Sequence, residues 1–228
     1  MTQLPMFLPD SDWKPPTELP DLRRMRDVSL DSETKDDGLA QGRGPGWAYR
    51  AGHIAGIGAA WREGSQLRSF YAPLRHPETT CFEPDQLRRW LTDHFAVPGI
   101  RWVFQNAPYD LGWFRAELGV RPPELIDDTN AAAVMVDENK LSYKLDRLCR
   151  EYGVPGKDEA LLREAAAAYG YHGTKVKENL WRLPGRFVGP YGEGDPESTL
   201  QLIEVLRPML EEQGHQGAHP LEMDRSPL

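Results

Sequence analysis

Apolar and polar positions alternate around residues 28–33. Val28 and Leu30 are apolar, while Ser29, Asp31 and Glu33 are polar. Because successive side chains of a strand point to opposite faces, this pattern predicts a strand that ends in two carboxylates on one face. Neighbouring like charges repel, and acidic residues are poor strand formers. Taken alone, the pair is most simply a solvated strand end.

Other segments show the periods of strands and helices. HIAGIGAAW and LRSFYAPL flank REGSQ and predict a hairpin, and IRWVFQN predicts a buried strand. Helices are predicted for EPDQLRRWLTDHF, YDLGWFRAEL, DTNAAAVMV, SYKLDRLCREYG, DEALLREAAAAYG and STLQLIEVLRPMLEEQ. We expect Ser142 and Asp158 to cap two of these helices and Gly153 to end one. Strands followed by helices that interleave with a later strand favour an α/β or α+β domain with a mixed sheet.

The organisation predicted along the chain has three parts. Residues 1–24 carry five prolines and predict an extended arm with apolar anchors such as Trp13. Residues 25–212 form the predicted domain, and residues 213–228 form a flexible tail. The glycine-rich stretch GLAQGRGPG lacks the GK[ST] ending of a phosphate-binding loop, so it is read as a flexible connection.

Composition narrows the function class. The 228-residue chain has a formal net charge of −8 and two cysteines. The acidic balance argues against nonspecific polybasic binding of membranes or nucleic acid, but an acidic metal centre would itself lower the charge. Two cysteines without a CxxC or Cys/His cluster argue against a disulfide framework or zinc site and fit a reducing cytosol. No apolar run is long enough to span a membrane.

Two further acidic motifs follow the first. Asp110 comes directly after a predicted strand, in FQNAPYD, where it is either a helix cap or a functional acid. Tyr191 precedes Asp195 by four residues in PYGEGDPEST, a spacing that places both on one face of a helix. The alternative is a turn with Asp195 as a cap and Pro196 in the first turn.

Taken in order, these motifs resemble the DEDD superfamily of 3′–5′ exonucleases. The matching residues are Asp31 and Glu33, Asn106 and Asp110, and Tyr191 and Asp195. The tyrosine places the chain with the DEDDy branch, because the other branch has histidine at the position of Pro190. The resemblance implies an α/β fold, a ribonuclease H-like mixed β-sheet flanked by helices.

Longer segments are similar to the exonuclease region of bacteriophage family A DNA polymerases. They include DENKLSYKLDRLCREYG, GKDEALLREAAAAYG and NLWRLPGRFVGPY. The similarity implies a proofreading exonuclease that hydrolyses DNA 3′ ends to 5′-mononucleotides, in the cytoplasm of a bacterial host if phage-encoded. The expected partners are a single-stranded DNA 3′ end and a polymerase module in cis or in trans, with no membrane. The tail HPLEMDRSPL resembles the start of a linker to such a module.

The resemblance also implies roles for residues. Two divalent cations, Mg²⁺ or Mn²⁺, would be held by Asp31, Glu33, Asp110 and Asp195, with Asp31 bridging both. Tyr191 would orient the attacking water, because a phenol with a pKa of about 10 is a poor base at pH 7. Asn106, Tyr109 and Thr34 are candidates for substrate binding. Stacking aromatics and cations hold single strands, and the options near the motifs are Trp47, Arg43, Lys35, Trp181 and Arg182.

Alternatives remain at this point. The chain could be a nucleic-acid-binding module with a degenerate site, or an RNA exonuclease of the same superfamily. Gly192, Gly194 and Pro196 are poor helix formers. We therefore expect the last helix to begin at Asp195 and to leave Tyr191 on a loop.

Overall fold

A five-stranded sheet forms the centre of the protein. The computed structural model describes residues 8–214, and the strand order is β3-β2-β1-β4-β5. The strands are β1 (Asp27–Asp36), β2 (Gly52–Glu63), β3 (Gln66–Pro73), β4 (Arg101–Phe104) and β5 (Leu125–Asp128). Strand β1 pairs antiparallel with β2 and parallel with β4, so the sheet is mixed. The predicted hairpin is the antiparallel pair β2 and β3.

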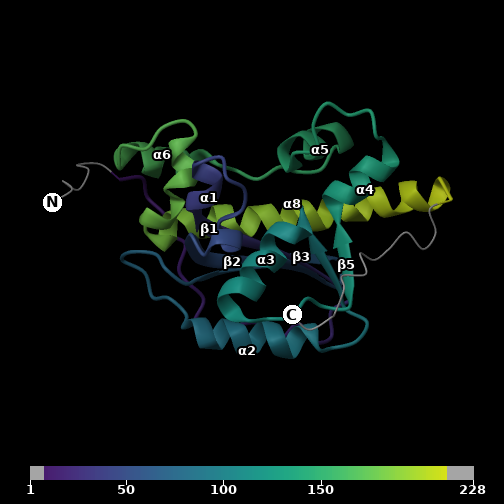
Figure 1. The fold of residues 1–228 in the computed structure, drawn as a ribbon, viewed down its shortest axis with the longest axis horizontal. Helices are drawn as coiled ribbons and strands as arrows, with labels where there is room; N and C mark the ends of the chain where they lie inside the picture. Colours follow the sequence, from purple (N-terminus) through teal and green to yellow (C-terminus); the bar gives the residue numbers. More distant parts are fainter. Residues whose placement is uncertain (1–7, 215–228) are drawn as a thin grey trace.

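Helices cover both faces of this sheet (Figure 1). They are α1 (Asp37–Ala40), α2 (Pro84–Phe95), α3 (Ala107–Leu118), α4 (Thr129–Val136), α5 (Leu145–Tyr152), α6 (Ala160–Ala168), α7 (Lys175–Glu178) and α8 (Gly185–Glu212), with 3₁₀ turns η1 (Gly46–Tyr49) and η2 (Leu180–Arg182). Helices α2 and α3 share a core with one face, and α4, α5 and α8 enclose a second core on the other. Within residues 8–214, none of the helices could span a membrane.

Strand β1 is longer than its pattern predicted. Val28 and Leu30 are buried in the core beneath α2 and α3, as the alternation requires. The strand does not end at the acid pair, because pairing with β2 continues to Asp36 after an irregularity between Glu33 and Thr34. The acids therefore lie within a paired strand, opposite Gly58 and Gly56 of β2, and not at its end.

Two predicted caps are displaced, and one strand escaped prediction. Helix α5 begins after Lys144, because the Ser142 hydroxyl accepts the Lys144 N–H in a turn that precedes the helix. Helix α6 begins after Glu159, and Asp158 instead accepts the Ala160 N–H from one position earlier. The predicted stop of α5 at Gly153 is confirmed by its left-handed backbone, φ 69°. The missed strand, β5, is only four residues long and half acidic.

Helix α8 is the long helix that crosses the sheet in Figure 1. It runs continuously from Gly185 to Glu212 with prolines inside it, so the expectation that it begins at Asp195 is wrong. A proline removes one N–H from a helix and leaves the carbonyl four residues earlier without its usual donor. For Pro190 that carbonyl belongs to Arg186, and the Ser11 hydroxyl donates to it at 2.7 Å.

The chain from residue 8 to residue 24 has neither helix nor strand. Ser11 bonds to α8 near its start, whereas Pro20 and Leu22 bond to α2. Trp13 packs against Gly189, where a Cβ would lie 2.1 Å from the indole, and its Nε1–H donates to Glu193 at 2.9 Å. These contacts fix the N-terminal segment to the helix that carries the third acidic motif. Of the predicted tail 213–228, all but the first two residues lies outside the described residues.

Candidate active site

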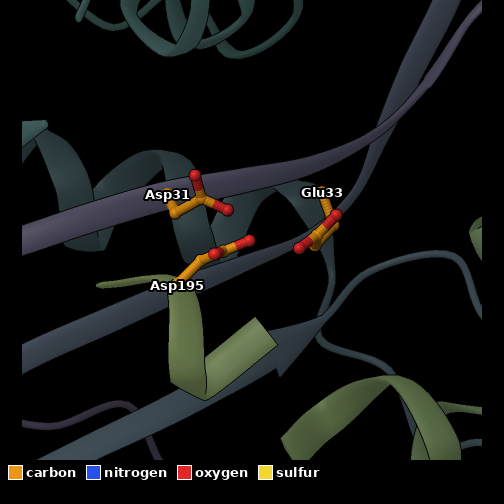
Figure 2. A group of neighbouring side chains, drawn as sticks. All are labelled: Asp31, Glu33 and Asp195. Carbon is orange, nitrogen blue, oxygen red and sulfur yellow. The ribbon is translucent and has the colours of Figure 1, made fainter. Parts of the chain in front are cut away.

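Three carboxylates from distant parts of the sequence converge on one point. Asp31 and Glu33 come from β1 and Asp195 comes from α8 (Figure 2). One oxygen from each lies within 4.8 Å of the others. Asp195 is buried, and Asp31 and Glu33 are partly buried. The first and third predicted motifs therefore meet in space although 162 residues separate Glu33 from Asp195.

Close packing of α8 on the sheet brings the third carboxylate into place. Asp31 pairs across the sheet with Gly58 of β2. A Cβ on Gly58 would lie 2.0 Å from the Gly192 carbonyl oxygen, and a Cβ on Gly192 would lie 2.4 Å from the Tyr71 ring. The helix approaches this closely because neither position carries a side chain. Gly192, which seemed to break the helix, instead allows the helix to pack closely on the sheet.

The electrostatics of the cluster are those of crowded acids. Burial, with the charges of Asp110, Asp195 and Glu33, raises the pKa of Asp31 well above its ordinary value. Burial and the Asp195 charge raise the pKa of Glu33 to about 8. Both effects disfavour the ionised form, because a buried charge loses its hydration and like charges repel. An added cation would relieve both penalties.

Asp110 lies next to this group and is held differently. It is buried on α3, and one of its oxygens accepts from both the backbone N–H and the hydroxyl of Ser32, at 2.9 and 2.6 Å. Burial raises the pKa of Asp110 to about 7, although the Ser32 donors oppose that rise. Ser32 lies between Asp31 and Glu33 in sequence, so β1 positions the second motif as well as the first.

Lys157 is the residue that the sequence reasoning missed. Its ammonium lies 2.6 and 2.7 Å from the two oxygens of Asp195 and donates to the Tyr191 hydroxyl at 3.0 Å. Tyr191 lies one turn before Asp195 on α8, and not on the loop that Gly192, Gly194 and Pro196 had led us to expect. Lys157 precedes a helix in a loop without any metal-ligand or catalytic spacing, so only the phage-like stretch GKDEALL contained a signal for it.

Comparisons with known proteins agree with this geometry. A 3′–5′ exonuclease family of type A DNA polymerases matches residues 76–211. A DNA-directed DNA polymerase of Pseudomonas phage M6 is 31% identical over 231 residues, which cover 99% of this chain and 34% of the polymerase. This chain belongs to the 3′–5′ exonuclease family of type A DNA polymerases. It spans about a third of the length of the phage relative.

Solved structures show the fold of this exonuclease family member. Brucella melitensis NrnC, alone or with bound Mg²⁺, is similar to this chain with a TM-score of 0.55 and 16% identity. The match covers 88% of this chain and 82% of NrnC. The apo form of another nuclease has a TM-score of 0.51 at 14% identity, covering 82% of this chain and 74% of the nuclease. The predicted ribonuclease H-like fold and the predicted family are thus confirmed.

The acid cluster of this family member fits a hard divalent cation. All of its donors are carboxylate oxygens, the ligand type that Mg²⁺ and Mn²⁺ prefer. Oxygen Oε1 of Glu33 is buried and has no hydrogen-bond partner among the described residues. Buried acceptors without partners are costly. A cation between β1 and α8 would satisfy this oxygen and offset the repulsion.

The predicted substrate-binding residues lie on the elements that carry the acids, Thr34 on β1 and Asn106 and Tyr109 at the start of α3. Asn106 is exposed and has a left-handed backbone, φ 67°, with its N–H bonded to Asp128. The hydroxyls of Thr34 and Tyr109 are 2.8 Å apart, and that of Tyr109 donates to Asp36 at 2.8 Å. These two hydroxyls tie β1 to α3. Their role toward a substrate stays a prediction.

Cations and an indole gather where β1 meets η2. The Lys35 ammonium lies 5.5 Å from the centre of the Trp181 ring, and the Arg182 guanidinium lies 4.3 Å from it. His53 meets the same ring edge-on at 5.5 Å. Lys35 is two residues from Glu33, so this group borders the acids. Trp47, another sequence candidate, instead packs on the core against Gly112.

Proposed function

We propose that this chain removes nucleotides from the 3′ end of DNA, single-stranded or frayed, and releases 5′-mononucleotides with the help of two divalent ions. The observation that carries the proposal is the convergence of Asp31, Glu33 and Asp195 in a member of an exonuclease family. Two bound ions would lower the pKa of the attacking water and stabilise the leaving 3′ oxygen. In this proposal Asp31, Glu33 and Asp195 would hold the ions, with Glu33 and Asp195 serving the ion that activates the water.

Two other residues of the chain have separate roles in this proposal. Asp110 would serve the second ion, and the hydrogen bonds from Ser32 would fix the direction in which its carboxylate points. Tyr191 orients the attacking water. Burial and the nearby Glu33 and Asp195 charges raise the pKa of Tyr191 well above its ordinary value, so the phenol stays protonated and does not act as a base.

The group of Lys35, Trp181 and Arg182 supports a nucleic-acid substrate. Single strands are bound by cations that follow the phosphates and by aromatic rings on which bases stack. We place the last nucleotides of the strand along this group, next to Glu33. Replacing Trp181 with alanine should then raise KM for an oligonucleotide about tenfold and leave kcat near its original value, since stacking contributes about 1–3 kcal/mol per base.

The test is digestion of one oligonucleotide sequence, made as DNA and as RNA and labelled at either end. With Mg²⁺ or Mn²⁺, 3′-labelled DNA should release labelled mononucleotide at once, and 5′-labelled DNA should shorten stepwise. Asp195→Asn should abolish both, whereas Asp93→Asn, at an exposed position on α2, should change neither. Intact DNA after long incubation, or digestion that survives excess chelator, would contradict the proposal. Faster digestion of RNA would assign the same chemistry to RNA.

We propose a role in proofreading, which the phage relative supports. That relative is a DNA polymerase of which this chain matches 34%. We propose that the chain acts with a polymerase module, in cis or in trans, inside a bacterial host. A degenerate binding module is disfavoured, because such a module would have no need to hold three repelling acids together.

A further inference from the structure

Lys157 holds Asp195 in a way that conflicts with metal binding. Its ammonium lies 2.6 and 2.7 Å from the two Asp195 oxygens and 4.5 Å from the centre of the Tyr191 ring. The Lys157 side chain is only 7% exposed. A divalent ion on the water side needs at least one of those oxygens, and two cations at one carboxylate repel each other.

The structure also contains a second location for this ammonium. Asp146 of α5 lies 4.0 Å from Nζ, and Glu159 at the start of α6 lies 3.7 Å from it. Both acids line a cavity of about 290 Å³ whose wall includes Lys157, Gly156 and Cys149. A lysine ammonium sits on a flexible stem with three rotatable donors. An ammonium turned from Asp195 toward this cavity would stay beside two carboxylates, of which Glu159 is shared with Lys177 at 2.9 Å.

We propose that the Lys157 ammonium is a built-in counter-cation, which occupies the water-side position of the acid cluster until a divalent ion binds. The incoming ion then displaces the ammonium into the cavity beside Asp146 and Glu159. The inference rests on the proposed metal centre. Before metal arrives, the lysine offsets the repulsion among Asp31, Glu33 and Asp195, so the cluster stays assembled. The same contact weakens metal binding, because each ion must first break the Lys157–Asp195 pair.

The experiment measures Mn²⁺ affinity by calorimetry and by electron paramagnetic resonance, without substrate. Lys157→Met keeps the length of the side chain and removes its charge, so it should bind Mn²⁺ at least tenfold more tightly than the unmodified chain. Metal-free Lys157→Met should also melt at a lower temperature, because its acids lose their counter-cation. Asp146→Asn with Glu159→Gln removes the alternative partners and should weaken Mn²⁺ binding at least threefold.

Lys140 provides a matched control. Its side chain is also 7% exposed, it pairs with Asp137 and Glu151, and it lies 5.0 Å from the centre of the Tyr152 ring. Lys140→Met should leave Mn²⁺ affinity unchanged. Weaker or equal binding by Lys157→Met overturns the displacement but leaves the proposed function standing. If Lys157→Met fails to fold, unchanged affinity in the Asp146/Glu159 variant overturns it instead. Absence of Mn²⁺ binding in every protein overturns the metal centre itself.

Discussion

Helix α8 carries two buried charge clusters, and they differ in balance. Near its start, Asp195 meets Asp31 and Glu33 of β1, and Lys157 is the cation in direct contact. Twelve residues later on the same helix, Arg207 lies 2.6 Å from Asp27 of β1 and 2.8 Å from Asp127 of β5. Both clusters join α8 to β1, about 18 Å apart along the helix at 1.5 Å per residue.

The two clusters differ in how far their charges are compensated, which distinguishes a candidate active site at Asp195 from a structural ion pair at Arg207. Around Arg207, two acids share one guanidinium, and Arg26 and Arg101 approach them at 3.7 Å, so charge is compensated by the chain. Around Asp195, acids outnumber cations and their pKa values are raised. Uncompensated buried charge lowers stability, and such arrangements gather where function requires them. An acid cluster therefore indicates function by its surplus of charge, not by burial.

The largest effect is expected when one acid is removed from the cluster of Asp31, Glu33 and Asp195. Asp31→Ala should slow hydrolysis about a thousandfold, because metal ions supply several kcal/mol of transition-state stabilisation and about 1.36 kcal/mol is one decade. The metal-free variant should melt no lower than the unmodified chain, since it loses a repulsion. Single-turnover cleavage and a thermal melt measure both. Near-normal activity in the folded variant would refute the assignment of Asp31.

The balanced cluster should respond in the opposite way. Arg207→Met leaves Asp27 and Asp127 buried without their main cation and should lower the free energy of unfolding by about 3–5 kcal/mol. Catalysis by the folded fraction should change little. Urea unfolding measures the loss, and adding Asp27→Asn and Asp127→Asn to Arg207→Met should recover most of it. A large loss of rate with unchanged stability would show that both clusters act in catalysis.

Low pH should lower the stability of the fold around α8, because a buried neutral histidine, His76, would have to take up a proton. Buried His76 donates from Nδ1 to the Leu183 carbonyl at 2.9 Å and accepts from the hydroxyl of Tyr71, the ring that packs on Gly192. Burial lowers the pKa of His76 to about 4. The unfolded chain therefore takes up its proton first, and stability present above about pH 6.5 is lost as the pH falls.

The matched variant is His76→Gln, which does not titrate. Its unfolding free energy relative to the unmodified chain should improve by about 2 kcal/mol between pH 7 and pH 5. Urea unfolding at a series of pH values measures the difference, in which the titration of the acid cluster cancels. A difference that does not vary with pH would show that the fold accepts protonated His76 without cost.

The smallest expected effect is the loss of rate on replacing Tyr191, which we compare with the loss on replacing Asp195. Tyr191→Phe should slow single-turnover cleavage only about tenfold, because in the proposal the metal activates the water that the phenol merely orients. Asp195→Ala should slow it by orders of magnitude, because it removes a proposed metal ligand. If Tyr191→Phe is as inactive as Asp195→Ala, the phenol does more than orient water.

Sequence reasoning succeeded where pattern and close spacing decide structure. The alternation at Val28 and Leu30 predicted β1, and Gly153 predicted the end of α5. It failed where tertiary packing overrides propensity. Gly192 and Pro196 looked like helix breakers, but tight packing on Gly58 and Tyr71 keeps them helical. The contact of Lys157 with Asp195 could not be predicted, because the two residues are 38 positions apart and no local spacing indicates such a contact.

The contact between Ser11 and Arg186 has a consequence for the order of synthesis. It closes a loop of 175 residues, and the acid cluster likewise waits for Asp195, in the last helix of the described chain. At about 5–20 residues per second, the 162 residues from Glu33 to Asp195 take about 8–30 s to be made. During that interval β1 has left the ribosome with its acid pair, but neither Asp195 nor the helix that the N-terminal segment binds yet exists. The exonuclease centre is thus completed only after translation has passed α8, before any module that follows it in the same chain could be finished.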